Sequence, residues 1–143
     1  MRMIDVPECF YRISVKALIL NEERDRFLVI KENEEWELPG GGLDWGESVE
    51  SELKREIMEE MGLGVEWISK IPAYFTVSEM RKHPGRWAAN ILYETKLESL
   101  NFTPTSECSA VAFVNKEQAN GMSLFPNVES LLEQFDPRNH DLV

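Results

Sequence analysis

The sequence predicts an α/β fold, because segments with strand-like composition lie on both sides of one strongly amphipathic helix. The chain has 143 residues, of which 43% are hydrophobic and 29% charged, as is ordinary for a globular protein with a buried core. No run approaches the ~18 apolar residues that a membrane span requires. We expect one domain over residues 1–143, with its core between about residues 11 and 136 and a loose tail at 137–143.

The first third of the chain carries three strand signals. Residues 11–21 and 27–31 are apolar and rich in β-branched residues, and residues 36–38 form a shorter segment of the same kind. The third strand leads into three glycines, residues 40–42. Because glycine tolerates positive φ and has no side chain, we expect a loop here that can approach a ligand closely.

A helix is expected between Ser48 and Gly62. Ser48 is a typical N-cap residue, acidic residues in the first turn suit the helix dipole, and Gly62 is a typical terminator. Four apolar residues recur at every fourth position and predict the buried face of this helix: Val49, Leu53, Ile57 and Met61.

The second half predicts further strands and two helices. Residues 65–77 and 87–97 are expected to be two strands joined by an irregular loop around His83, and residues 111–114 a short strand. Asn115 and Gln118 fit a capping box that starts a brief helix, and Pro126 opens the last helix. The apolar face of that last helix comprises Val128, Leu131, Leu132 and Phe135.

The central helix carries an unusual density of carboxylates. At 100° per residue, Glu56, Glu59 and Glu60 fall on about a third of the circumference, with Glu52 beside them. Each like-charge pair at this spacing costs about 0.2–0.5 kcal/mol. A divalent cation would turn this repulsion into attraction, because hard cations such as Mg²⁺ bind carboxylate oxygens. The segment therefore indicates a metal site.

The same segment resembles the signature of the Nudix hydrolase family, the MutT-like pyrophosphohydrolases. The signature is a glycine, five residues, Glu, seven residues, and then Arg-Glu-aliphatic-x-Glu-Glu-x-Gly-aliphatic. All nine specified positions are filled here with the expected spacing, by Gly41, Glu47, Arg55, Glu56, Ile57, Glu59, Glu60, Gly62 and Leu63. The resemblance implies the Nudix α/β/α sandwich, with a mixed sheet between helices.

The resemblance also implies a reaction, hydrolysis of a nucleoside diphosphate linked to another group X, with Mg²⁺ or Mn²⁺ as cofactor. It assigns metal binding and water activation to Glu56, Glu59 and Glu60, and leaves open which of them is the general base. The carbonyl of Gly40 matches a further oxygen ligand in relatives. Arg55 and Glu47 are expected to form a supporting pair. Family members often add an acidic ligand from the second half of the chain, and Glu107 is the candidate here.

Outside the motif, two features are candidates for substrate binding. Residues 80–86 hold three of the fifteen basic residues, so Arg81 and Arg86 could clamp phosphates, although a solvated hairpin tip has the same composition. Trp45, in the loop before the helix, is the best placed aromatic residue to stack on a base.

The charge balance limits the partners. A net charge of −11 disfavours nucleic-acid polymers and anionic membranes, which need clustered Lys and Arg. Bound cations would offset the repulsion between this protein and a phosphate substrate. Cys9 and Cys108 lack metal-type spacing and fit two reduced thiols in a cytoplasmic protein. A homodimer is possible.

The motif specifies a reaction and not a substrate. A (d)NTP or small nucleotide derivative is the leading expectation, with ADP-ribose or a nucleotide sugar as the alternative within the enzyme class. The proline that follows the motif in many ADP-ribose hydrolases is not matched, because Ser78 and Glu79 occupy that region. A competing reading is a nucleotide-sensing module without turnover. Such modules usually lose motif carboxylates, and this chain retains them all.

Overall fold

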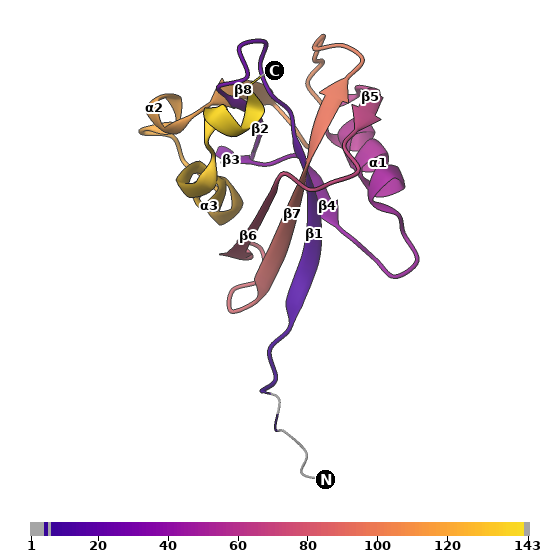
Figure 1. The fold of residues 1–143 in the computed structure, drawn as a ribbon, viewed down its shortest axis with the longest axis vertical. Helices are drawn as coiled ribbons and strands as arrows, with labels where there is room; N and C mark the ends of the chain where they lie inside the picture. The colour runs from indigo at the N-terminus through magenta and orange to yellow at the C-terminus, as the bar shows by residue number, and fades with distance from the viewer. Residues whose placement is uncertain (1–4, 6, 142–143) are drawn as a thin grey trace.

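The computed structural model of the chain describes residue 5 and residues 7–141, and in this part eight strands and three α-helices form a mixed α/β architecture (Figure 1). The predicted α/β fold with a mixed sheet is confirmed. The elements are β1 (Tyr11–Leu18), β2 (Phe27–Glu32), β3 (Glu35–Glu37), β4 (Gly40–Gly42), α1 (Val49–Met61), β5 (Val65–Ile68), β6 (Tyr74–Glu79), β7 (Trp87–Leu97), β8 (Ala110–Val114), α2 (Lys116–Ala119), α3 (Pro126–Gln134) and the 3-10 helix η1 (Pro137–His140).

Two sheets make up the centre of the molecule. The larger has the order β4-β1-β7-β5, with β6 also paired to β7, and the smaller has the order β3-β2-β8. β1 and β7 run parallel over eight residue pairs, and their other pairings are antiparallel. Successive residues of a strand face opposite sides of the sheet. On β1, Arg12, Ser14 and Lys16 therefore share one face, and Tyr11 and Ile13 share the other.

The helices cover the sheets from different sides, α1 at one side of the molecule and α3 at the other (Figure 1). Leu53, Ile57 and Met61 of α1 are fully buried in a core cluster with residues of β1 and β2. A second cluster joins Val128 and Leu131 of α3 to other residues of β1 and β2. None of the helices in the described part is long and apolar enough to cross a membrane.

Local signals placed α1 correctly. The Ser48 side chain accepts a hydrogen bond from the Ser51 N–H, and Gly62 ends the helix in the left-handed conformation with φ 67°. The predicted capping box of Asn115 and Gln118 is also present, at the start of α2.

Two strand predictions were wrong in detail. Residues 65–77 form two strands, β5 and β6, separated at residues 69–73, where Pro72 has no N–H to donate. Both pair with β7, which is long enough to serve one partner at each end. Residues 40–42, expected as a loop, form the short strand β4 against β1.

The prediction of a loose tail was wrong for residues 137–140, which form η1. The Tyr74 hydroxyl lies 2.7 Å from His140 Nε2, and Arg24 Nε donates to the His140 carbonyl at 2.6 Å. The Tyr74 hydroxyl also accepts a hydrogen bond from the Asp136 N–H at 3.2 Å. It can therefore donate its own proton to Nε2 of a neutral His140 ring. These buried contacts hold the segment; residues 142–143 lie outside the described residues.

Burial lowers the pKa of His140 below its ordinary value. The unfolded chain, with a normal histidine, then binds a proton more readily than the folded one, so this group removes stability as the pH falls through about 6.5. We predict that the stability advantage of the wild type over His140→Gln, measured by urea unfolding, shrinks between pH 7.5 and pH 5.5. The matched variant Asn139→Gln, at the exposed neighbour in η1 that carries no titratable group, should keep a constant difference. A constant difference for His140→Gln as well would contradict the prediction.

Candidate active site

A cavity of about 430 Å³ lies between α1 and the polar face of the larger sheet, within the range typical of ligand pockets. One part of its wall is acidic and the other carries basic and neutral polar groups. The acidic side chains are Glu32, Glu37, Glu56, Glu59, Glu60, Glu79 and Glu107, and the other polar side chains include Arg12, Ser14, Lys16, Ser78, Arg81, Lys82, His83, Asn90 and Asn127.

β4 reaches the cavity wall because its glycines leave room for their neighbours. A Cβ on Gly40, whose φ is +126°, would collide with the Val15 carbonyl oxygen and lie 2.9 Å from Lys16 Cα. A Cβ on Gly41 would lie 2.8 Å from Glu56 Oε1. At Gly40 the clash is with fixed backbone atoms, so glycine is required for β4 to pack against β1, whereas a Cβ at Gly41 would displace the end of the flexible Glu56 side chain.

Glu60 is the most deeply placed carboxylate of the motif. It is 5% exposed, and its Oε1 accepts a hydrogen bond from the Gly40 N–H at 3.0 Å. Burial raises the pKa of Glu60 well above its ordinary value, while the positive charge of Lys16 opposes this shift. Burial likewise raises the pKa of Glu37 to about 7, again against the effect of Lys16.

Arg55 organises the other carboxylates of α1. Its Nη2 donates to both oxygens of Glu52 at 2.7 Å and lies 3.1 Å from Glu56, and its Nη1 donates to both oxygens of Glu59 at 3.1 Å. The expected pair of Arg55 with Glu47 is not formed among the described residues. Glu47 precedes the helix and accepts the Asp44 N–H at 2.8 Å, whereas Glu52 and Glu59 lie three and four residues away on the same helix face.

The residues proposed as metal ligands fit a hard cation in their chemistry. Glu56, Glu59, Glu60, Glu107 and the Gly40 backbone all line the cavity and offer oxygen donors, which Mg²⁺ and Mn²⁺ prefer. Their side chains do not converge as they stand. Within residues 5 and 7–141, no group of three or more His, Cys, Asp or Glu side chains is gathered as a metal would need, and Glu56 and Glu59 are turned toward Arg55.

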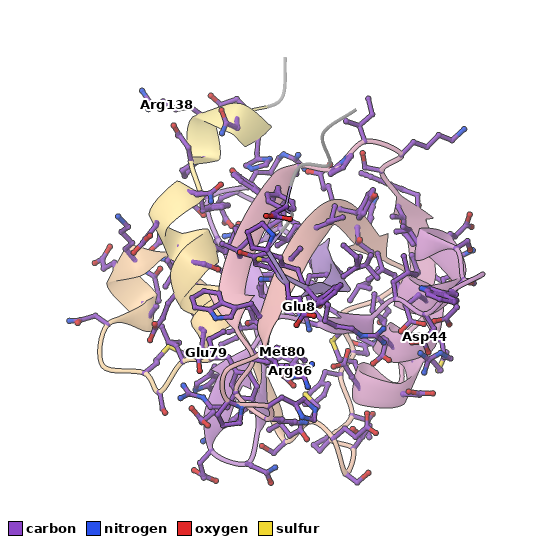
Figure 2. All side chains as sticks on the ribbon, turned by 90° about the horizontal axis from the view of Figure 1, so that it is seen from below. Glu8, Asp44, Glu79, Met80, Arg86 and Arg138 are labelled. Atoms are coloured by element: carbon purple, nitrogen blue, oxygen red, sulfur yellow. The ribbon has the colours of Figure 1, made fainter. Side chains whose placement is uncertain are left out.

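The predicted substrate-binding residues are placed differently from one another. Arg81 lines the cavity, but its guanidinium pairs with Glu35 at 3.0 Å and donates to the Leu124 carbonyl at 2.9 Å. Arg86 lies beside Met80 at the β6–β7 hairpin (Figure 2), where the Met80 N–H donates to its carbonyl at 2.8 Å. Neither Arg86 nor the fully exposed Trp45 is part of the cavity wall.

Sequence reasoning missed several cavity residues, among them Lys16, Glu37 and Asn90. All three are buried, and Asn90 spends both its N–H groups on Thr76 and Ser78. Only a partial signal was present in the sequence, since Lys16 and Asn90 are each flanked directly by two apolar residues in their strands. Their position in one cavity depends on the pairing of β1 with β7, which the sequence does not show.

Comparison with known proteins supports the family resemblance of the glutamate motif. A family model described as the NUDIX domain matches residues 10–136. "Nucleoside diphosphate-linked moiety X motif 6" of Xenopus laevis is 28% identical over 98 residues, covering 65% of this chain and 43% of that protein. An "RNA pyrophosphohydrolase" of Ruthia magnifica is 42% identical over 60 residues, 41% of this chain and 34% of that protein. The chain thus spans less than half the length of these two relatives.

Among solved structures, the MutT protein from Methanosarcina mazei Go1 superposes with a TM-score of 0.73 at 26% identity. The match covers 95% of this chain and all of that one (100%).

The glycine requirement at β4 gives a stability prediction. Gly40→Ala should lower the free energy of unfolding by about 3 kcal/mol, because the new Cβ meets fixed backbone atoms at an unfavourable φ. Gly46→Ala is the matched control, since Gly46 also has positive φ (+84°) but no atom within 4 Å of the added Cβ; we expect a loss of about 1 kcal/mol. Urea unfolding followed by circular dichroism measures both. Equal losses of unfolding free energy in the two variants would show that the close packing of β4 against β1 does not add to stability.

Proposed function

The chain belongs to the Nudix family, and we propose that it is a metal-dependent pyrophosphohydrolase acting on a nucleoside diphosphate linked to a group X. The products would be a nucleoside monophosphate and pyrophosphate or phospho-X. The observation that carries this proposal is the presence of Glu56, Glu59 and Glu60 in the wall of one cavity, beside the Gly40–Gly42 strand.

Glu56, Glu59, Glu60, the Gly40 carbonyl and Glu107 are the proposed ligands of Mg²⁺ or Mn²⁺. Such a cation, when bound, neutralises phosphate oxygens and lowers the pKa of water. The protein's own contribution is to hold these oxygens in place. The Gly40 N–H fixes the Glu60 carboxylate, and Arg55 restrains Glu56 and Glu59 through the contacts described above. One of the three glutamates acts as general base toward the attacking water.

Glu47 has a supporting role in this proposal. Its carboxylate accepts the Asp44 N–H, and this bond closes the loop between β4 and the start of α1. The sequence suggested a direct pairing of Glu47 with Arg55. In the structure Glu47 instead stabilises the loop that precedes α1.

A (d)NTP or another small nucleotide derivative remains the leading substrate. The cavity volume of about 430 Å³ supports a small molecule, and ADP-ribose or a nucleotide sugar is the alternative. The similarity to RNA pyrophosphohydrolases makes a 5′-triphosphate RNA a necessary comparison, although the net charge of −11 disfavours binding of a polymer. A homodimer stays a prediction, and so does a cytoplasmic location.

The reaction is tested by a product assay against a nucleotide panel that includes ADP-ribose, nucleotide sugars and 5′-triphosphate RNA, with Mg²⁺ or Mn²⁺. We expect cation-dependent release of a monophosphate product, and a fall in kcat of about 100-fold or more in Glu60→Gln. Glu50→Gln is the matched control, because Glu50 is an exposed α1 residue paired with Lys54 and is not part of the cavity wall.

Three outcomes would change this proposal. Turnover that survives Glu60→Gln would mean that the catalytic glutamates are wrongly assigned. Nucleotide binding without any product would favour the sensing module. Turnover that persists after removal of divalent cations with a chelator would contradict metal dependence.

The basic hairpin gives a second prediction. Arg81→Ala should raise KM about fivefold and lower kcat less, because Arg81 contributes to the cavity wall rather than to the carboxylate cluster. Arg86→Ala should change KM in the same direction but by less, since Arg86 lies outside the wall. Arg138→Ala, at an exposed ion pair with Asp136, is the control. Unchanged steady-state kinetics in both hairpin variants would contradict a role of these arginines in binding substrate phosphates.

A further inference from the structure

Lys16 is a buried lysine in the cavity wall whose charge has no role in the mechanism above. It lies on β1 between the fully buried Val15 and Ala17, and only 6% of it is exposed. Among the described residues, no carboxylate oxygen lies within 4.0 Å of its ammonium. Burying a charge without a carboxylate in contact is costly, and the more distant carboxylates of Glu37 and Glu60 offset part of this cost.

The ammonium of Lys16 is held by backbone carbonyls. Nζ donates to the Gly40 carbonyl at 3.1 Å and to the Leu38 carbonyl at 3.3 Å. An ammonium has three donors, so these two bonds leave one N–H for another acceptor. Because Lys16 lines the cavity, that acceptor can come from a bound molecule.

The other basic residues of the cavity wall with long side chains are already paired. Arg12 binds Asp44 at 2.6 Å, Arg81 binds Glu35 at 3.0 Å, and Lys82 lies 3.5 Å from Glu32. Each of these charges therefore already has a protein carboxylate within 4.0 Å. Of the Lys and Arg residues that line the cavity in the described part of the chain, Lys16 alone lacks an ion-pair partner.

The position of Lys16 close to the proposed cation-binding residues indicates which part of a substrate it would contact. Lys16 pairs with Gly40 in the β1–β4 register, and Gly40 in turn donates its N–H to Glu60. Lys16 thus lies beside the residues proposed to hold the cation, where the scissile diphosphate of a substrate has to sit. Positive charge there attracts phosphate oxygens in a protein that is otherwise strongly acidic.

We propose that Lys16 is a substrate-binding residue whose ammonium, anchored by the carbonyls of Leu38 and Gly40, donates its remaining N–H to a phosphate oxygen of the scissile diphosphate. The identity of the substrate as a diphosphate rests on the proposed function. The binding step itself needs only a compact phosphate anion, so it can be tested without turnover.

The test is calorimetric titration of the folded protein with inorganic pyrophosphate in the presence of Mg²⁺. Lys16→Met removes the charge and keeps the apolar stem, and we expect the Kd for pyrophosphate to rise about tenfold or more. Lys96→Met is the matched control, because it changes the net charge equally at an exposed residue outside the cavity wall, paired with Glu66. It should bind pyrophosphate as the wild type does. Lys16→Met should not weaken the binding of Mn²⁺ alone, because Lys16 is a positive charge bonded to the Gly40 carbonyl, a proposed ligand, so a loss of pyrophosphate affinity would come from the phosphate contact.

Lys16→Gln provides a second variant in case Lys16→Met does not fold. Its amide can still donate to the backbone carbonyls but carries no charge, so pyrophosphate binding should again weaken, and KM for any nucleotide that is hydrolysed should rise more than kcat falls. Wild-type affinity for pyrophosphate in either folded variant overturns the proposal. Loss of folding in both would assign Lys16 a structural role and overturn it too. If the wild type hydrolyses nothing in the panel, the proposed function fails, while the pyrophosphate titration still decides the role of Lys16.

Discussion

The close approach of the Gly40–Gly42 strand to β1 on one side and to α1 on the other is the constraint on which the rest of the structure depends. Gly40 packs against the backbone of Val15 and Lys16, and Gly41 lies against the Glu56 carboxylate, at distances that leave no space for a Cβ. At this spacing the Gly40 N–H donates to Glu60 and the Gly40 carbonyl accepts from Lys16. The fold and the cavity therefore share one requirement, which is the absence of a side chain at Gly40.

The buried carboxylates of the cavity wall are unfavourable in their charged forms because burial removes them from water. Burial disfavours the charged forms of Glu37 and Glu60, and Lys16 offsets part of that cost through its positive charge. On α1, Arg55 bonds to the buried Glu52 and to the more exposed Glu59 and so relieves the like-charge repulsion between turns of the helix. A protein with a surplus of negative charge can keep such a cluster because each carboxylate has a nearby donor or cation, and the cluster remains able to accept divalent ions.

Sequence reasoning succeeded where the determinants are local. The limits of α1 follow from Ser48 and Gly62, and its buried face follows from the four-residue spacing that includes Leu53 and Ile57. It failed where the outcome depends on pairing between distant segments. The pairing of β5 and β6 with opposite ends of β7 joins distant segments, and the order in residues 137–140 reflects contacts with Tyr74 and Arg24. The glutamates of the candidate site were visible as a motif, while Lys16 and Asn90 became recognisable only through the parallel pairing of β1 with β7.

The motif glutamates could be recognised from the sequence and Lys16 and Asn90 could not, because the two groups lie on different kinds of secondary structure. The three motif glutamates lie on one helix within five positions of one another, from Glu56 to Glu60, and so leave a pattern in the sequence, whereas the other acidic wall residues come from separate segments. The basic and neutral polar part comes mainly from alternate positions on three strands, three residues on β1 and one each on β6 and β7, and from the β6–β7 hairpin. A helix-borne metal site is therefore readable from sequence spacing, whereas sheet-borne binding residues require the strand order. Because the reaction chemistry is assigned to the helix and the remaining wall to the sheet, the reaction class is more readily inferred from this sequence than the substrate.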